Sequence, residues 1–166
     1  ARRQRPDVGG IASSMMAPED RQRILTRARP PRSAYVGCER GAGYVMAARE
    51  AGFPLDRLIW MDVDDQFPDS AGARLAQLRP RLAGHERVAL VAMSDRMALA
   101  ARQEARRWRG QHLVSVVGFD DIPAAAHAGL TTVRQDSRRK GEIAVQVLLD
   151  GGTPPTVPTQ LVEREP

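Results

Sequence analysis

Short apolar segments of strand length alternate along this chain with longer segments that have helical periodicity. The alternation predicts strands at 33–37, 58–63, 87–93 and 113–119, with helices between them at 43–52, 70–84 and 95–108. Strands joined by helices of this length run parallel, because each helix returns the chain to the end of the sheet where the next strand begins. Helices cover both faces of such a sheet. The sequence therefore predicts a doubly wound α/β fold with a mainly parallel sheet.

The two ends of the chain do not follow this alternation. Residues 1–17 are rich in Arg, Gly and Ser and predict an irregular lead-in. A proline followed by two acidic residues then predicts the start of a helix at 18–29. Toward the C-terminus, a predicted helix at 136–150 is followed by a proline-rich link and an edge strand at 159–165.

The composition favours a soluble globular protein. Hydrophobic residues make up 42% of the chain and charged residues 27%, which are ordinary values. No apolar run approaches the roughly 18 residues that a membrane helix needs, and the N-terminus lacks the apolar middle region of a secretory signal. The single cysteine, Cys38, excludes an internal disulfide and fits a reducing compartment. We expect a cytoplasmic protein without membrane contact.

The net charge of +5 comes entirely from the N-terminal part of the chain. Residues 1–40 hold nine arginines against four acidic residues, whereas residues 41–166 hold sixteen basic and sixteen acidic ones. Basic clusters can indicate nucleic-acid contact. However, Lys140 is the only lysine, and such a uniform use of arginine fits a codon bias equally well. The charge is therefore a weak indication of direct nucleic-acid binding.

Polar residues stand where the predicted strands end. In an open parallel sheet the carboxyl ends of the strands lie at one edge, and ligands bind just outside it. This rule places on one rim Arg40, Asp64, Asp65, Phe67, Ser94, Asp95, Asp120 and Asp121. The spacing of Asp120 fits helix capping and ligand binding equally, whereas Asp95 and Asp121 are expected to cap helices.

No catalytic or metal-binding motif accompanies this rim. The segment 37–43 lacks the Gly-Lys-Ser/Thr ending of a phosphate-binding loop, and Met46 occupies the third glycine position of a dinucleotide fingerprint. A calcium loop at 62–73 would need glycine at Phe67 and an acid at Ala73. The three histidines lie far apart. We therefore expect no cofactor, no bound metal and no enzymatic activity.

Three motifs in order resemble the LacI/GalR family of bacterial transcriptional regulators. They are "SDRMALA" at 94–100, "VSVVGFDD" at 114–121, and "LTTVRQD" at 130–136 followed by "GEIAVQVLL". The likeness covers roughly 33–166 and implies the fold of type I periplasmic sugar-binding proteins. It also implies an allosteric regulator whose two subdomains hold a small effector, commonly a sugar or nucleobase.

The resemblance also implies the residues that contact the effector. Arg40 matches the family's ligand-contacting arginine, and Asp120 matches a strand-end aspartate that accepts hydrogen bonds from ligand hydroxyls. Phe67 matches an aromatic residue that packs against the ligand, and Gln135 a glutamine where the chain crosses between subdomains. Ser94 stands where the family usually has asparagine. A hydroxyl offers no amide fork, so this position departs from the usual sugar-binding pattern.

The resemblance further implies a division of the chain and a set of partners. We expect a basic lead-in with a helix from the N-terminal subdomain at 1–32 and the C-terminal effector-binding subdomain at 33–135. A crossing helix with its linker is expected at 136–156, and a strand that returns to the C-terminal subdomain at 157–166. Pairing as a homodimer is expected. Nothing in the first of these parts resembles a helix-turn-helix, so operator DNA is expected to be contacted only through a head domain outside this chain.

Two other functions fit parts of the same pattern. One is a solute-binding protein of the same fold. The other is a small α/β enzyme that uses the acidic residues at 62–65 and 120–121 around Mg²⁺.

Overall fold

The protein folds around a single six-stranded sheet. The computed structural model describes residues 8–14, 36–63, 68–82, 85, 87–108 and 113–164. The strands are β1 (Val8–Ser14), β2 (Leu58–Asp62), β3 (Arg87–Val91), β4 (Leu113–Asp120), β5 (Thr132–Gln135) and β6 (Thr159–Val162). Their order in the sheet is β2-β1-β3-β4-β5-β6, with every pair parallel except β5 and β6. The predicted doubly wound, mainly parallel α/β fold is confirmed.

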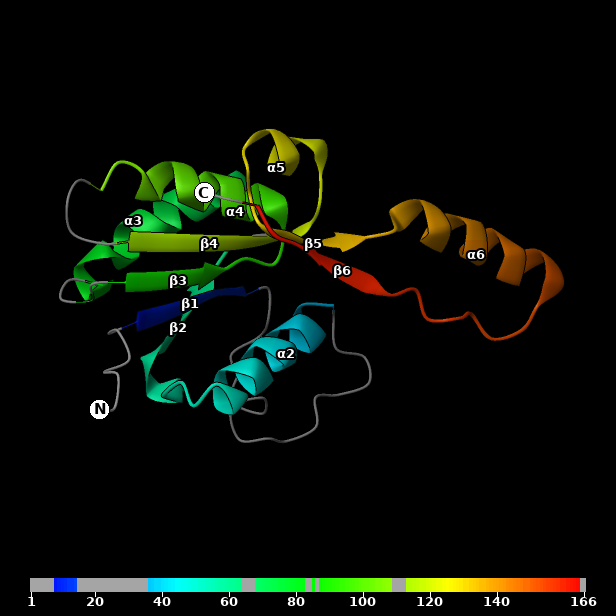
Figure 1. The fold of residues 1–166 in the computed structure, drawn as a ribbon, viewed down its shortest axis with the longest axis horizontal. Helices are drawn as coiled ribbons and strands as arrows, with labels where there is room; N and C mark the ends of the chain where they lie inside the picture. Colours follow the sequence, from blue (N-terminus) through cyan, green and yellow to red (C-terminus); the bar gives the residue numbers. More distant parts are fainter. Residues whose placement is uncertain are drawn as a thin grey trace.

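The α-helices are α2 (Val36–Glu50), α3 (Ala71–Leu82), α4 (Asp95–Ala105), α5 (Pro123–His127) and α6 (Ser137–Asp150). Short 3₁₀ turns lie at Leu55–Arg57 and Pro68–Ser70. Helices α3 and α4 lie together against the sheet, whereas α6 projects away from it (Figure 1). No helix in the described ranges has both the length and the apolar character to cross a membrane.

Alternate residues of β2 show that both faces of the sheet are covered. Ile59 and Met61 belong to the large core that also contains buried side chains of α3 and α4. Leu58 and Trp60 instead pack with Cys38 of α2, in a second and smaller cluster. Because successive side chains of a strand point to opposite faces, α2 covers the face opposite α3 and α4.

The prediction for the N-terminal lead-in was wrong. Residues 8–14 form β1, which lies inside the sheet and pairs with β2 through Ile11↔Ile59 and with β3 through Ile11↔Leu90. The segment "VGGIASS" has little of the β-branched and aromatic content that marks a strand, so its pairing depends on the two neighbouring strands. These residues therefore belong to the same sheet as the rest of the chain and not to a separate remnant. The predicted helix at 18–29 lies outside the described residues.

The strand predicted at 33–37 is also corrected. Val36 and Gly37 are the first residues of α2, and 33–35 lie outside the described residues. The apolar composition of this segment suits either structure. Burial of Cys38 and Val45 on one side of the helix favours the helical arrangement.

Asp95, predicted to cap α4, is instead a buried link between three elements. Its carboxylate accepts a hydrogen bond of 2.5 Å from Thr132 Oγ1 of β5 and one of 2.8 Å from the backbone N–H of Ile122. The cap of α4 is Ser94, whose Oγ accepts from Met97 N. Ser94 has the extended backbone that a capping residue needs, and this leaves the next carboxylate for the interior.

Replacing Asp95 by alanine is expected to lower the free energy of unfolding by about 2–5 kcal/mol, because a buried hydroxyl and a partly buried N–H lose their acceptor. Urea denaturation measures this. The control is Asp69→Ala, which removes an exposed ion pair of 3.2 Å with Arg96 and should cost less than about 1 kcal/mol. Equal losses in the two variants would show that the buried link does not stabilise the fold.

Candidate effector site at the strand ends

Arg40 extends from α2 to the carboxyl ends of β3 and β4. Its Nη1 donates a hydrogen bond to the carbonyl oxygen of Met93, and its Nη2 lies 3.8 Å from Asp120 Oδ1. The guanidinium also stacks on Phe119, with Cζ 3.7 Å from the ring centroid, a cation–π geometry. Only 17% of the Arg40 side chain is exposed. Three separate contacts therefore hold this cation in place before any ligand arrives.

Asp120 ends β4 in an unusual backbone conformation. Its φ is 115°, a region that non-glycine residues rarely adopt and that recurs at functional sites. The carboxylate is 35% exposed and accepts a hydrogen bond of 2.7 Å from Gln135 Nε2. Burial raises the pKa of Asp120, although the Gln135 hydrogen bond and the charges of Arg40 and Lys140 oppose this shift. The site thus presents a partly exposed acceptor.

Gln135 connects this acceptor to α6. Its Nε2 donates to Asp120, and its Oε1 accepts from Nζ of Lys140. Both ends of the amide are engaged, which fixes its orientation. A continuous polar chain therefore runs from Lys140 on α6 through Gln135 and Asp120 to Arg40 on α2.

Tyr44 and Lys140 were not predicted from the sequence. Tyr44 lies one helical turn after Arg40, and its hydroxyl donates to the carbonyl oxygen of Ala92 at 3.3 Å. Burial raises the pKa of Tyr44 to about 12, so the phenol stays protonated at neutral pH. Helical spacing from Arg40 could have indicated Tyr44, since residues four apart share a helix face. Lys140 could have been noticed as a cation in the first turn after Gln135.

The ligand contacts predicted for Ser94 and Phe67 remain predictions, as do those of the other three residues. The hydroxyl oxygen of Ser94 lies 3.3 Å from Met97 N, as the acceptor of the α4 cap. That bond uses the oxygen and leaves the hydroxyl proton to donate to another group. Phe67, like Asp64 and Asp65, lies outside the described residues.

Asp121, predicted to cap the following helix, has a different role. The capping position of α5 is Ile122, which makes no side-chain cap. Asp121 accepts hydrogen bonds of 2.6 Å from both Arg134 and Arg164. The two guanidinium groups engage both carboxylate oxygens, Oδ2 and Oδ1, and such charge-assisted bonds are strong. The two guanidinium groups lower the pKa of Asp121 and tie its carboxylate to β5 and to the chain beyond β6.

The adjacent acids are expected to affect stability in opposite directions. A lowered pKa stabilises the fold above the unfolded-state pKa, and this contribution is lost as pH falls through the lower folded-state value. Asp121→Asn should therefore reduce stability at pH 7 and weaken the acid dependence below about pH 4. A raised pKa acts oppositely, so Asp120→Asn should increase stability at pH 7.

Both variants suit the positive φ at these positions, because asparagine tolerates it. Urea unfolding at a series of pH values measures the two effects. A loss of stability at pH 7 in both variants would contradict the assignment.

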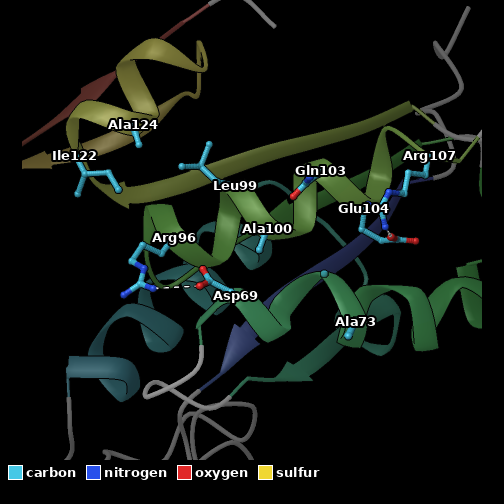
Figure 2. A pocket seen from close by; sticks show the side chains of 11 residues that line it. Asp69, Ala73, Arg96, Leu99, Ala100, Gln103, Glu104, Arg107, Ile122 and Ala124 are labelled. Atoms are coloured by element: carbon cyan, nitrogen blue, oxygen red, sulfur yellow. Dashed lines mark hydrogen bonds and ion pairs between the residues drawn. The ribbon is translucent and has the colours of Figure 1, made fainter.

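A separate hollow of about 630 Å³ lies between α3, α4 and the start of α5. Figure 2 shows the charged pairs Arg96–Asp69 and Arg107–Glu104 toward opposite ends of α4, with Leu99 and Ala100 between them. The residues that line it include Gly72, Leu99, Ala100, Ile122 and Ala124, together with Asp69, Arg96, Glu104 and Arg107. We call it the α3–α4–α5 groove. Its lining shares no residue with the polar chain at the strand ends.

Proteins similar to this chain include regulators of transcription. A family profile described as "Periplasmic binding protein-like domain" matches residues 21–166. An HTH-type transcriptional regulator of Mycobacterium tuberculosis is 35% identical over 144 residues, which cover 82% of this chain and 38% of that protein. A probable transcription regulator from Thermus thermophilus superposes with a TM-score of 0.66 and 29% identity, over 94% of this chain and 58% of the other.

A third match is the transcriptional regulator CelR in complex with cellobiose. Its TM-score is 0.61 at 25% identity, over 96% of this chain and 46% of the other. The chain spans less than half the length of the curated relatives that it matches.

The fold and the matched profile define the class: the chain belongs to the periplasmic binding protein-like family. The matched profile and the transcriptional regulators among its relatives support the resemblance to the LacI/GalR regulators.

Proposed function

We propose that the chain is the effector-sensing part of a LacI-type transcriptional regulator and binds a small polyhydroxylated molecule at its strand ends. The observation that carries this proposal is the convergence of Arg40 and Asp120, from α2 and β4, at one edge of the sheet. A sugar hydroxyl both donates and accepts hydrogen bonds, so a carboxylate beside a guanidinium matches it well. The cellobiose complex of CelR supports a sugar as the effector class.

The site is proposed to bind its ligand without catalysing a reaction. Tyr44 keeps its proton at neutral pH and is therefore a poor general base. Asp121 is engaged by two arginines, which opposes its use as a Mg²⁺ ligand in the enzyme alternative. A solute-binding protein would use the same ligand chemistry, but relatives of this chain are named as transcriptional regulators.

The exposed side of α6 supports a second subdomain facing the site. Val145, Leu148 and Leu149 are all exposed, and Leu148 has 82% of its surface accessible. An apolar stripe of this kind is usually covered by another part of a protein. We propose that the facing subdomain of the regulator packs on α6, and that operator DNA is contacted by a head domain beyond this chain. A protein that binds operator DNA in this way would act in the cytoplasm.

Effector binding is tested by isothermal titration with a panel of sugars that includes cellobiose. Arg40→Met and Asp120→Ala should each weaken binding of the active sugar by about tenfold or more, because each removes a charge-assisted hydrogen bond. The control Asp69→Ala changes a charge in the α3–α4–α5 groove and should leave the affinity unchanged. Retained affinity in both site variants would refute the proposed site.

The α3–α4–α5 groove is proposed as the homodimer interface. Its inner wall is apolar and its edge carries both signs of charge, in the pairs Arg96–Asp69 and Arg107–Glu104. A dry centre with a polar rim is the usual build of protein interfaces. A second copy related by twofold symmetry would meet each charge pair with an equivalent pair.

Sedimentation velocity tests this interface. Ala124→Arg should shift the protein from dimer to monomer, because a guanidinium would enter the apolar wall of the groove. Ala126→Arg is the matched control: Ala126 is exposed on the same short helix but is not among the groove residues named above, so the dimer should persist. A monomer at all concentrations, or an equal effect of both variants, would contradict the proposal.

A further inference from the structure

We propose that Lys140 makes the strand-end site selective for sugars that carry an anionic group, either a carboxylate or a phosphate. The inference rests on the proposed function, since it concerns the ligand class of the same site. Lys140 was not among the residues that the family resemblance assigned to the site. A sugar acid and a sugar phosphate have the same two features, an oxyanion and a polyhydroxylated ring or chain.

Lys140 belongs to the site by contact. Its Nζ donates to Oε1 of Gln135, and Gln135 in turn donates to Asp120 at 2.7 Å. The ammonium group is close enough to Asp120 for its charge to lower the pKa of that carboxyl. Lys140 is exposed, so the ammonium group is accessible to a ligand. These contacts place a second cation near the acceptor, on α6 instead of α2.

The carboxylate of Asp120 makes no direct hydrogen bond with Arg40 or Lys140 among the contacts of the described residues. Nη2 of Arg40 lies 3.8 Å from Asp120, which is beyond direct hydrogen-bond distance. Lys140 reaches Asp120 only through the neutral amide of Gln135. Gln135 is the group that donates directly to the carboxylate. Both cations therefore retain N–H groups for a further acceptor.

The cations of this polar chain favour an anion. Arg40 and Lys140 both lie near the carboxylate of Asp120, on which the charge of Asp95 also acts. Lys140 bonds to the neutral amide of Gln135, so a neutral sugar would satisfy Asp120 and leave this ammonium group with a neutral partner. A ligand oxyanion beside Lys140 would supply a charged partner, and hydroxyls of the same ligand could bind Asp120 and Arg40. Lysine suits this role because it binds carboxylate and phosphate as a mobile point charge.

Other cations of α6 do not offer the same position. Arg138 and Arg139 both pair with Glu142, at 3.1 and 3.2 Å. Arg138 is 91% exposed, and its Nε is engaged by Glu142 and not by a residue of the polar chain. Arg138 therefore provides a matched control: a cation two residues from Lys140, on the same helix, with a different partner.

The test is isothermal titration, carried out with this chain and with the full-length protein. The probes are matched series built on glucose, galactose, ribose and cellobiose, each as the neutral sugar, the sugar acid and the sugar phosphate. We expect one acid or phosphate to bind about tenfold or more tightly than its neutral parent. Comparison of the acid and phosphate arms identifies which oxyanion is preferred.

The variants assign this preference to Lys140. Lys140→Met should reduce the preference to about threefold or less, Lys140→Arg should restore most of it, and Arg138→Met should leave it unchanged. Tighter or equal binding of the neutral sugars, or a preference that survives Lys140→Met, would overturn the inference while leaving the sensor function intact. Binding of no sugar in any series would refute the proposed function, and this inference with it.

Discussion

The arrangement of the site depends on the hydrogen bonds that the buried carboxylate of Asp95 accepts. It binds Thr132 of β5 and the backbone of Ile122, and so fixes β5 and the turn after β4 relative to the start of α4. Gly118 of β4 lies directly against this carboxylate, where any Cβ would overlap it. Asp120 follows Gly118 by two residues on β4, and Gln135 follows Thr132 by three on β5. The positions of Asp120 and Gln135 thus both depend on the buried carboxylate of Asp95.

The same arrangement explains why adjacent aspartates differ. Asp121 is satisfied by two arginines of neighbouring segments, and it stabilises the fold through these bonds. Asp120 receives one direct hydrogen bond from a neutral amide, while the nearest guanidinium is bound to a backbone carbonyl. Burial raises its pKa, so the charged form is held at some cost to stability. An acceptor kept partly unsatisfied in this way is available to a ligand, as is common for functional groups.

The sequence predicted the class of fold because that class follows from a strong periodicity. Strands such as β3 and β4 are mainly apolar, and α4 buries Met97, Ala98 and Ala101 on one side. It did not predict β1, because "VGGIASS" has weak strand propensity and is held by the strands on either side. The rule for strand ends predicted the position of Asp120. It placed Arg40 at the rim through a strand at 33–37, which is instead the start of α2, so only the family resemblance implied that Arg40 approaches Asp120. The partners of Asp95 and Asp121 were not, because a carboxylate beside a helix start has the same local spacing whether it caps the helix or bonds to a distant strand.

The two cations of the site stand on helices that are attached to the protein in different ways. The helix that carries Arg40 packs on the sheet through Cys38 and Val45. The helix that carries Lys140 projects from the sheet (Figure 1), and Ile143 is its one buried residue. Its orientation near the site is set by the Asp136 cap, which accepts from Arg139 N at 2.8 Å, and by the bond from Lys140 to Gln135. A ligand that engages both cations would therefore restrain α6 relative to the sheet. Where this restraint changes the affinity of a partner for the exposed apolar side of α6, the partner changes the affinity for the ligand by the same factor.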